Sequence, residues 1–330
     1  MGPPSIEFLL GPVEHELRRR GCDVARFGDV AAFCADRATL DRADVWMVDG
    51  RLPITRRLMA QAPRLRAIVS PWTGTEAFDE VAATDLGVLV ANGQAPENVL
   101  SVAESTVMLM LAALYDLRGA ERRLREGLPE PEPRRESARM MRGRTVGLIG
   151  FGQIARAVTR RLEAWEVGLQ AYAPRPPASA PASVRFVSLE ALMSTSDVVS
   201  IHAPLNAETK GLLGADRLRL LKPDAVLINV ARGGIVDEGA LVALSRERPD
   251  FRVAFDVFAT EPLPMDSPLR ALPNAILTPH AVAHTREVMA ELPRTAIESV
   301  MRALEGREPL YVRNRAILPR WLERWGTRAV

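Results

Sequence analysis

The chain has little cysteine, no excess of one charge and no long apolar run, and each shortage excludes a class of protein. Only Cys22 and Cys34 occur in 330 residues, too few for a disulfide framework or a thiolate metal cluster. The 43 basic and 41 acidic side chains nearly balance, so no surface for nucleic acid or membrane is indicated. The longest apolar stretch, residues 107–115, falls short of the ~20 residues of a bilayer span. We therefore expect a soluble cytoplasmic protein.

Two catalytic signatures are also missing. No Gly-x-Ser-x-Gly segment occurs, so the nucleophile of a serine hydrolase is not indicated. The four histidines, His15, His202, His280 and His284, form no zinc-binding pattern with each other or with the cysteines. We therefore predict no metal site.

Short apolar runs alternate with helical patterns along the chain, and 47% of its residues are hydrophobic. This alternation is typical of an α/β protein, and the length favours two domains. The first part contains strand-like runs at residues 6–10, 44–50, 65–70 and 87–93. The second part contains seven more, which predicts a doubly wound, mostly parallel sheet buried on both faces; they are residues 145–150, 168–172, 184–187, 197–202, 225–230, 251–257 and 275–279.

A glycine-rich turn follows the strand-like run at residues 145–150. Gly150, Gly152 and Ala155 form a G-x-G-x-x-A pattern, and an amphipathic helix follows. Gly150 permits the tight turn, Gly152 lets a pyrophosphate approach the backbone, and small Ala155 lets the helix pack on the strand. Amides near Gln153 and Ile154 would direct partial positive charge at the phosphates. The pattern predicts dinucleotide binding; the alternative is an ordinary strand-to-helix turn.

The end of the second strand of this sheet bears on the choice of cofactor. A carboxylate about 20 residues after the glycine-rich turn usually binds the adenosine ribose, but Ala173 occupies that place and Arg175 follows. Without the acid nothing repels a 2′-phosphate, and Arg175 supplies a cation. We therefore expect NADP. The alternative is that Arg175 is a solvated loop residue and NAD binds through other contacts.

Polar residues follow three later strand-like runs, where a doubly wound sheet binds its ligands. Arg232, Glu261 and His280 together would suit hydride transfer at a carbon next to a carboxylate. The guanidinium would bind the carboxylate, the imidazole would exchange a proton with the hydroxyl, and the Glu would orient the imidazole. Taken singly, these residues could instead be a helix cap, a loop acid and a strand-end residue. By residue type alone, His284 competes with His280.

Five segments stand in the order and approximate spacing of one protein family: GRTVGLIGFGQIA, SDVVSIHAPLNAET, LINVARGGIVDEGAL, DVFATEPLP and LTPHAVAHT. Through them, residues 65–314 resemble the D-isomer-specific 2-hydroxyacid dehydrogenases, which include phosphoglycerate dehydrogenase and glyoxylate/hydroxypyruvate reductase. The resemblance implies that Arg232 binds substrate and that Glu261 pairs with His280, the proton donor, in preference to His284. It also implies a set of cofactor contacts, namely Gln153, Ile154, Ala203, Pro204, Val230 and Asp256.

The resemblance further implies two doubly wound open-sheet domains. A Rossmann cofactor domain, residues 99–286, would be inserted into a flavodoxin-like substrate domain, residues 1–98 plus 287–330. The helix that begins near Ser101 would contribute to a homodimer interface. No role is implied for Trp321 and Trp325, four residues apart near the C-terminus.

The loop at residues 71–79 departs from the family pattern. Many relatives have glycine where this chain has Trp72, beside Thr73 and Gly74. The amides of Thr73 and Gly74 could still bind a substrate carboxylate, Thr73 could reach the cofactor, and Asn98 could donate to a substrate oxygen. Trp72 would narrow the site or stack on the substrate. We expect an NAD(P)-dependent reductase or dehydrogenase of a small 2-keto or 2-hydroxy acid. The alternatives are a phosphite- or formate-type dehydrogenase, or a cofactor-sensing binding protein on the same fold.

Overall fold

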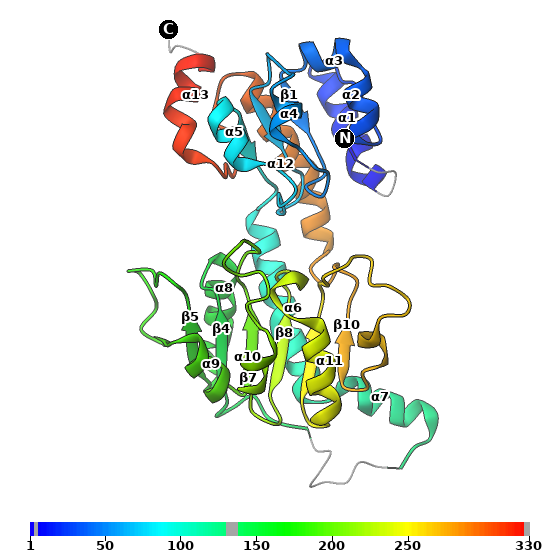
Figure 1. Ribbon diagram of the computed structural model, residues 1–330, viewed down its shortest axis with the longest axis vertical. Coiled ribbons are helices and arrows are strands. Elements are labelled where there is room, and N and C mark those ends of the chain that lie inside the picture. Colours follow the sequence, from blue (N-terminus) through cyan, green and yellow to red (C-terminus); the bar gives the residue numbers. More distant parts are fainter. Residues whose placement is uncertain (3–5, 130–137, 327–330) are drawn as a thin grey trace. The chain divides into compact units, whose positions relative to one another are not determined.

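The computed structural model describes residues 1–2, 6–129 and 138–326. The chain divides into two compact units, which Figure 1 shows coloured along the sequence. Unit 1 comprises residues 1–98 and 285–330, and unit 2 comprises residues 99–284. Unit 2 is therefore inserted, in sequence, within unit 1.

Unit 2 is built on a seven-stranded parallel sheet with the order β10-β9-β8-β7-β4-β5-β6. All seven predicted strand runs of this region are confirmed. The strand bounds are β4 (Thr145–Ile149), β5 (Gly168–Tyr172), β6 (Val184–Phe186), β7 (Val198–Ile201), β8 (Val226–Asn229), β9 (Arg252–Phe255) and β10 (Ala275–Leu277). Strand order reverses between β4 and β7, and in such sheets ligands bind beyond the carboxyl ends of the strands at this point.

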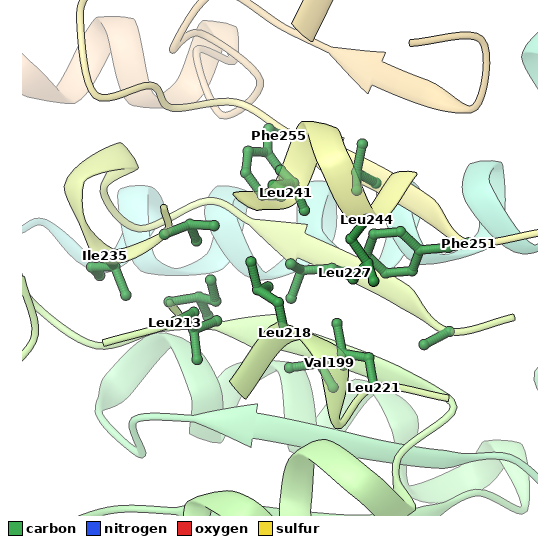
Figure 2. Close-up of a cluster of buried hydrophobic side chains, with 14 of the residues drawn as sticks. Val199, Leu213, Leu218, Leu221, Leu227, Ile235, Leu241, Leu244, Phe251 and Phe255 are labelled. Atoms are coloured by element: carbon green, nitrogen blue, oxygen red, sulfur yellow. The ribbon is translucent and has the colours of Figure 1, made fainter. Parts of the chain in front are cut away.

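Helices cover both faces of this sheet because neighbouring side chains in each strand point to opposite faces. Val198 of β7 and Ile228 of β8 belong to the core cluster that contains α6 and α8 residues. The neighbouring Val199 and Leu227 belong to the other cluster, with residues of α9, α10 and α11, shown in Figure 2. The helix bounds are α6 (Pro96–Leu114), α7 (Leu117–Glu126), α8 (Gln153–Leu162), α9 (Leu189–Thr195), α10 (Ala215–Arg219) and α11 (Glu238–Glu247), with 3₁₀ turns η2 (Glu163–Trp165), η3 (Gly233–Ile235) and η4 (Pro268–Ala271).

Helix α6 is apolar on most sides, as the sequence predicted. Within the described part of the chain, it is the one helix with the length and hydropathy of a membrane span. Its buried residues, Leu109 and Met110 among them, pack in the same core cluster as Val146 and Leu148 of β4. Burial in the core of unit 2 therefore explains the apolar residues on the inner side of α6, whereas Leu100 and Met108 are 42% and 50% exposed.

Unit 1 contains a parallel sheet with the order β1-β2-β3. Its strands are β1 (Val45–Met47), β2 (Ala67–Val69) and β3 (Leu89–Ala91). Its helices are α1 (Glu7–Arg19), α2 (Val30–Ala35), α3 (Arg37–Arg42), α4 (Arg56–Met59), α5 (Glu80–Leu86), α12 (Arg286–Leu304) and α13 (Leu318–Trp325), with the 3₁₀ turn η5 (Arg315–Ile317). The predicted α/β class with parallel sheets is confirmed in both units.

One predicted strand of unit 1 is wrong. Residues 6–10 were expected to be extended, but α1 begins at Glu7. The reason lies beyond the short run, since Leu9, Val13 and Leu17 recur every four residues and are buried together with residues of α12. Helical spacing over three turns outweighs a local apolar cluster.

The C-terminal segment forms the amphipathic helix α13. Trp321 is 1% exposed and its indole N–H donates to the carbonyl oxygen of Arg66, at 2.8 Å. It packs in a cluster with Ala67 of β2 and Leu89 of β3. Trp325 packs against the same cluster, so the two tryptophans together anchor α13 on the sheet of unit 1.

Candidate active site

The turn after β4 has the backbone that a tight approach to a ligand requires. Gly150 has φ +90°, in the left-handed region, and its N–H donates to the carbonyl of Tyr172 at 2.8 Å. A Cβ at this position would lie 2.7 Å from the backbone nitrogen of Ala203. Only glycine fits both the backbone conformation and the space, so this turn cannot tolerate a side chain.

Helix α8 begins directly after this turn. Gly152 caps it, and a Cβ on Gly152 would meet nothing within 4 Å. Gln153 and Ile154 are the first helical residues, and Ala155 is fully buried against the sheet. The N-terminal amides of α8 therefore face the open side of the glycine turn with a partial positive charge, which fits a pyrophosphate.

The loop after β5 carries cations and no carboxylate close to the strand end. β5 ends at Tyr172, and Arg175 is exposed. Arg156 of α8 reaches the same loop, where its guanidinium donates to the carbonyl of Ser179 at 3.1 Å. The sequence analysis missed Arg156, because its position on the helix gives no signal until α8 and the loop are placed side by side.

The buried side-chain amide of Asn229 fixes the loop after β8, which carries Arg232. Asn229, the last residue of β8, donates from Nδ2 to the Arg232 carbonyl at 3.0 Å. Its Oδ1 accepts from the N–H of Ala231 at 3.1 Å. Gly233 packs so closely on the next loop that a Cβ would lie 1.9 Å from the carbonyl carbon of Phe258. The Arg232 loop and the loop that follows β9 are thereby locked together.

Asp256 fixes the loop that carries His280. Its Oδ1 accepts from the Thr278 hydroxyl at 2.7 Å and from the N–H groups of Ala281 at 3.0 Å and Val282 at 3.2 Å. The N–H of His280 donates to the Asp256 backbone carbonyl at 2.7 Å. His280 has φ +53°, which is uncommon for a residue with a side chain. These hydrogen bonds hold the strained residue in place.

His280 and Glu261 form a hydrogen-bonded pair at the ends of β9 and β10. His280 Nδ1 lies 2.7 Å from Glu261 Oε2, and the side chains are 45% and 31% exposed. The other oxygen, Oε1, accepts from the Phe258 N–H at 3.0 Å. Burial opposes ionisation of Glu261, but the hydrogen bonds from His280 and Phe258 and the charges of His280 and Arg232 lower its pKa overall. The ring nitrogen Nε2 of His280 remains for a substrate.

The other histidines of unit 2, His202 and His284, have lowered pKa values. Partial burial and the charge of His280 lower the pKa of His284, although Asp256 acts in the opposite direction. Burial lowers the pKa of His202 to about 4, and its Nε2 hydrogen-bonds the Ser200 hydroxyl at 2.9 Å. His280 has Glu261 as its carboxylate partner at the strand ends.

Glu238 is a second carboxylate that the sequence analysis missed. It is the first residue of α11, and its Oε1 accepts from the N–H of Ala259 at 2.6 Å. Ala259 stands two residues before Glu261, so Glu238 ties the Glu261 turn to the N-terminus of α11. Nothing in a lone Glu after Asp237 signals this contact in the sequence.

The four predicted substrate residues of unit 1 lie around one loop after β2. Asn98 Nδ2 donates to the Thr73 hydroxyl at 2.6 Å, and the Gly74 carbonyl accepts from the Ser70 hydroxyl at 3.2 Å. Trp72 packs against the cluster of α1 and α12 residues. Within the described residues, the N–H groups of Thr73 and Gly74 have no hydrogen-bond acceptor, so they can serve an anion.

The structure therefore groups the predicted residues into two sets. In unit 2 the candidate residues all follow the carboxyl ends of strands, with Ala203 and Pro204 after β7 and Val230 after β8. In unit 1 Trp72, Thr73, Gly74 and Asn98 form the second set. Residues 1–2, 6–129 and 138–326 contain no group of three or more His, Cys, Asp or Glu that could hold a metal ion.

Comparisons with known proteins show which family the chain resembles. The family model for the NAD binding domain of D-isomer specific 2-hydroxyacid dehydrogenases matches residues 107–282. D-3-phosphoglycerate dehydrogenase of Mycobacterium tuberculosis H37Rv is 35% identical over 82% of this chain and 51% of its own length. The chain thus spans about half the length of that relative. Glyoxylate reductase of Aeropyrum pernix is 35% identical over 79% of this chain and 80% of its own length.

Two solved structures resemble the chain closely. NAD-dependent formate dehydrogenase from Staphylococcus aureus, in complex with NAD, has a TM-score of 0.74 and 30% identity, over 88% of this chain and 87% of that one. The acyclic imino acid reductase Bsp5, in complex with NADPH and D-Arg, has a TM-score of 0.79 and 26% identity, over 91% of this chain and 95% of that one.

The effect of the Arg232 charge on the pKa of Glu261 should be measurable. In Arg232→Met the pKa of Glu261 should rise, because the guanidinium favours the ionised carboxylate. Carbon-13 NMR of the labelled side-chain carboxyl would give the titration. Arg248→Met is a matched control, since Arg248 Nη1 donates to the Leu221 carbonyl and is absent from the charges that act on Glu261. An unchanged pKa in Arg232→Met would contradict the placement of Arg232.

The same shift has a consequence for stability. The folded-state pKa of Glu261 lies below its unfolded value, so the carboxylate contributes stability above the unfolded pKa. That contribution is lost as the pH falls through the folded-state pKa.

Proposed function

The chain belongs to the family of D-isomer-specific 2-hydroxyacid dehydrogenases, and we propose that it transfers a hydride between NAD(P)H and a small 2-keto or 2-hydroxy acid. The observation that carries the proposal is the His280–Glu261 pair beside Arg232. A bound nicotinamide would supply or accept the hydride. The chain's own residues would bind the acid and move the proton.

Each side chain has a separate task in reduction of a keto acid. Arg232 pairs with the substrate carboxylate and polarises the neighbouring carbonyl, because its guanidinium keeps its charge. As the hydride reaches the carbonyl carbon, His280 Nε2 donates a proton to the carbonyl oxygen, which becomes the hydroxyl. Glu261 orients the ring through Nδ1 and stabilises the protonated imidazole before transfer. Oxidation of the hydroxy acid follows the same steps in reverse.

The residues of unit 1 are proposed to recognise the acid end of the substrate. Free N–H groups at Thr73 and Gly74 suit a carboxylate, and Asn98 holds the Thr73 side chain at 2.6 Å. Trp72 is proposed to limit substrate size, since the side chain packs on α12 residues and cannot easily move away. The relatives named D-3-phosphoglycerate dehydrogenase and glyoxylate reductase indicate a 2-keto or 2-hydroxy acid as the substrate class, but they do not identify which acid.

A formate-type reaction is the second candidate because of the similarity to formate dehydrogenase of Staphylococcus aureus. Formate gives up its hydride and leaves as carbon dioxide, so that reaction requires no proton transfer. The hydrogen-bonded acid–base pair of this chain would then have no task. The pair therefore favours a keto or hydroxy acid over formate.

For the cofactor we propose NADP in preference to NAD. Arg175 lies in the loop after β5, and Arg156 of α8 donates to the Ser179 carbonyl of the same loop. Neither Ala173 nor its neighbours supply a carboxylate. The two guanidiniums suit a 2′-phosphate through charge-assisted hydrogen bonds. The glycine-rich turn after β4 and the N-terminus of α8 would hold the pyrophosphate. The nicotinamide end of the cofactor would be lined by Asp256, Val230, Ala203 and Pro204.

His280→Asn should lower kcat about 10²- to 10⁴-fold with glyoxylate, hydroxypyruvate and related 2-keto acids. Asn tolerates the left-handed backbone at this position, so the fold should persist. Steady-state absorbance of NADPH or NADH measures the rate. His284→Asn is the matched control and should lose less than tenfold.

Three results would contradict this assignment. Near-normal turnover of His280→Asn would remove its acid–base role. Turnover of formate or phosphite but of no keto acid would change the substrate class. Cofactor binding without turnover across the whole panel would favour a cofactor-sensing binding protein.

Ala173→Asp combined with Arg175→Ala should shift the ratio of kcat/KM for NADPH to that for NADH by about 10- to 100-fold toward NADH. The new carboxylate repels a 2′-phosphate, and a charged hydrogen bond is lost. Arg160→Ala, on the exposed side of α8, is the control. An unchanged ratio in the double variant would make Arg175 an ordinary surface residue.

We also propose that the protein is a cytoplasmic homodimer. Helix α7 has no buried residue, and its Leu117 and Leu124 are 62% and 86% exposed. Apolar residues on one helix without a partner are typical of an association surface. Light scattering should give twice the 36.2 kDa chain mass, and Leu117→Glu with Leu124→Glu should give monomers. Met265→Glu, at a residue 85% exposed, should leave the dimer intact.

A further inference from the structure

Near its N-terminus, helix α6 carries a hydroxyl group that bonds outside the helix. The hydroxyl residues of α6 are Ser101, Ser105 and Thr106. The Ser105 and Thr106 hydroxyls both donate to the Val102 carbonyl, at 3.1 and 2.7 Å, which is the usual local pattern for such residues within a helix. The Ser101 hydroxyl instead donates to the carbonyl of Ala283 at 2.8 Å, across 182 positions of the chain.

The hydrogen bond between Ser101 and Ala283 is buried within unit 2. Ser101 is 6% exposed and Ala283 is 9% exposed. Among the described residues, no backbone N–H donates to the Ala283 carbonyl, so the Ser101 hydroxyl is its donor. A buried carbonyl without a donor is unfavourable. The hydroxyl of Ser101 therefore satisfies a distant segment and not its own helix.

That segment, residues 280–284, begins with the candidate proton donor His280. Asp256 Oδ1 accepts from the two successive N–H groups that follow His280, which fixes the first part of the segment. Ser101 fixes the last part through the Ala283 carbonyl. The segment is thus held at one end from the end of β9 and at the other end from α6.

The backbone of His280 makes this double attachment necessary. His280 has φ +53°, and a residue in such a sparsely populated conformation persists only where its surroundings hold it. Glu261 lies on a different loop, which the N–H of Phe258 attaches separately. Releasing the Ala283 end would therefore let the His280 ring move relative to Glu261.

We propose that Ser101 is a positioning residue, whose hydroxyl holds residues 280–284 so that the His280 ring stays within hydrogen-bond reach of Glu261. Ser101 exchanges no proton with a substrate and acts only through the backbone of this segment. The effect on turnover rests on the proposed function, whereas the position of the ring does not.

The first measurement is the pKa of Glu261 in Ser101→Ala, by carbon-13 NMR of the labelled carboxyl. Burial raises this pKa, and the hydrogen bond from His280 is the largest of the contacts that lower it. Loosening the His280 ring should therefore raise the pKa of Glu261. Ser105→Ala is the matched control, because it removes a hydroxyl that bonds only within α6, and it should leave the pKa unchanged.

A second pair of variants separates the hydroxyl from the volume of the side chain. Ser101→Thr and Ser101→Val have the same shape, but only threonine retains the donor. The threonine variant should keep the wild-type pKa of Glu261, and the valine variant should raise it. This comparison decides the question even if Ser101→Ala does not fold.

The second measurement is steady-state reduction of glyoxylate with NADPH. Ser101→Ala should lower kcat about tenfold, because a small misplacement of the proton donor slows the reaction. The KM for glyoxylate should change less than about threefold, since Arg232 and the amides of Thr73 and Gly74 lie outside residues 280–284. Ser101→Thr should recover most of the lost kcat.

An unchanged pKa of Glu261 in Ser101→Ala and Ser101→Val, together with a lower melting temperature, would overturn the proposal. The hydroxyl would then only stabilise the fold. Equal effects of Ser105→Ala and Ser101→Ala on the pKa would overturn it as well. If the wild-type chain reduces no keto acid, the catalytic proposal fails, but the titration of Glu261 still decides whether Ser101 positions the His280 ring.

Discussion

Parallel pairing of the seven strands of unit 2 determines where the candidate site residues of that unit lie. In a parallel sheet all carboxyl ends meet at one edge, so residues that are far apart in sequence, from Gly150 to His280, reach the same edge. The reversal of strand order between β4 and β7 separates two loop groups there. One group presents the helix N-terminus of α8, and the other presents the Arg232, Glu261 and His280 loops. In the proposed reaction, a nucleotide and an acid would therefore bind at different places on this one edge.

Buried polar side chains keep these loops in register. Asn229 and Asp256 each stand at or just beyond a strand end and satisfy the backbone of the loop that follows. Glu238 does the same for the turn before Glu261. Such residues contact no substrate in the proposed reaction, yet they determine where the reacting groups stand. Apart from the bond between Asp256 and the Thr278 hydroxyl, these bonds are to backbone groups, so replacing the side chains of the loops changes specificity more readily than it changes geometry.

Much of the fold was visible in the sequence because the signals were local. Each strand of unit 2 is a short apolar run between turns, and the glycine turn after β4 carries its own pattern, so both were predicted. Arg156 and Glu238 were not, because their contacts join segments that only the fold brings together. Residues 6–10 were predicted wrongly since five residues cannot distinguish strand from helix, whereas the burial of Leu17 decides it. The positive φ of His280 has no signature in sequence, because it is imposed by hydrogen bonds to Asp256.

The position of β1 as the outermost strand of its sheet also affects how the protein is best handled in the laboratory. The outer side of β1 borders a groove of about 650 Å³ that is lined by Val45, Trp46 and Met47. An exposed strand edge is a template for strand addition, and concentrated solutions favour contacts between copies at such edges. A purification tag at the amino end begins next to Met47, so its sequence is part of the environment of the sheet. A tag at the carboxyl end follows α13, which packs against a different cluster. The end of the chain that carries the tag therefore affects the surroundings of the sheet. Solubility measured with a tag at the amino end does not predict solubility with a tag at the carboxyl end.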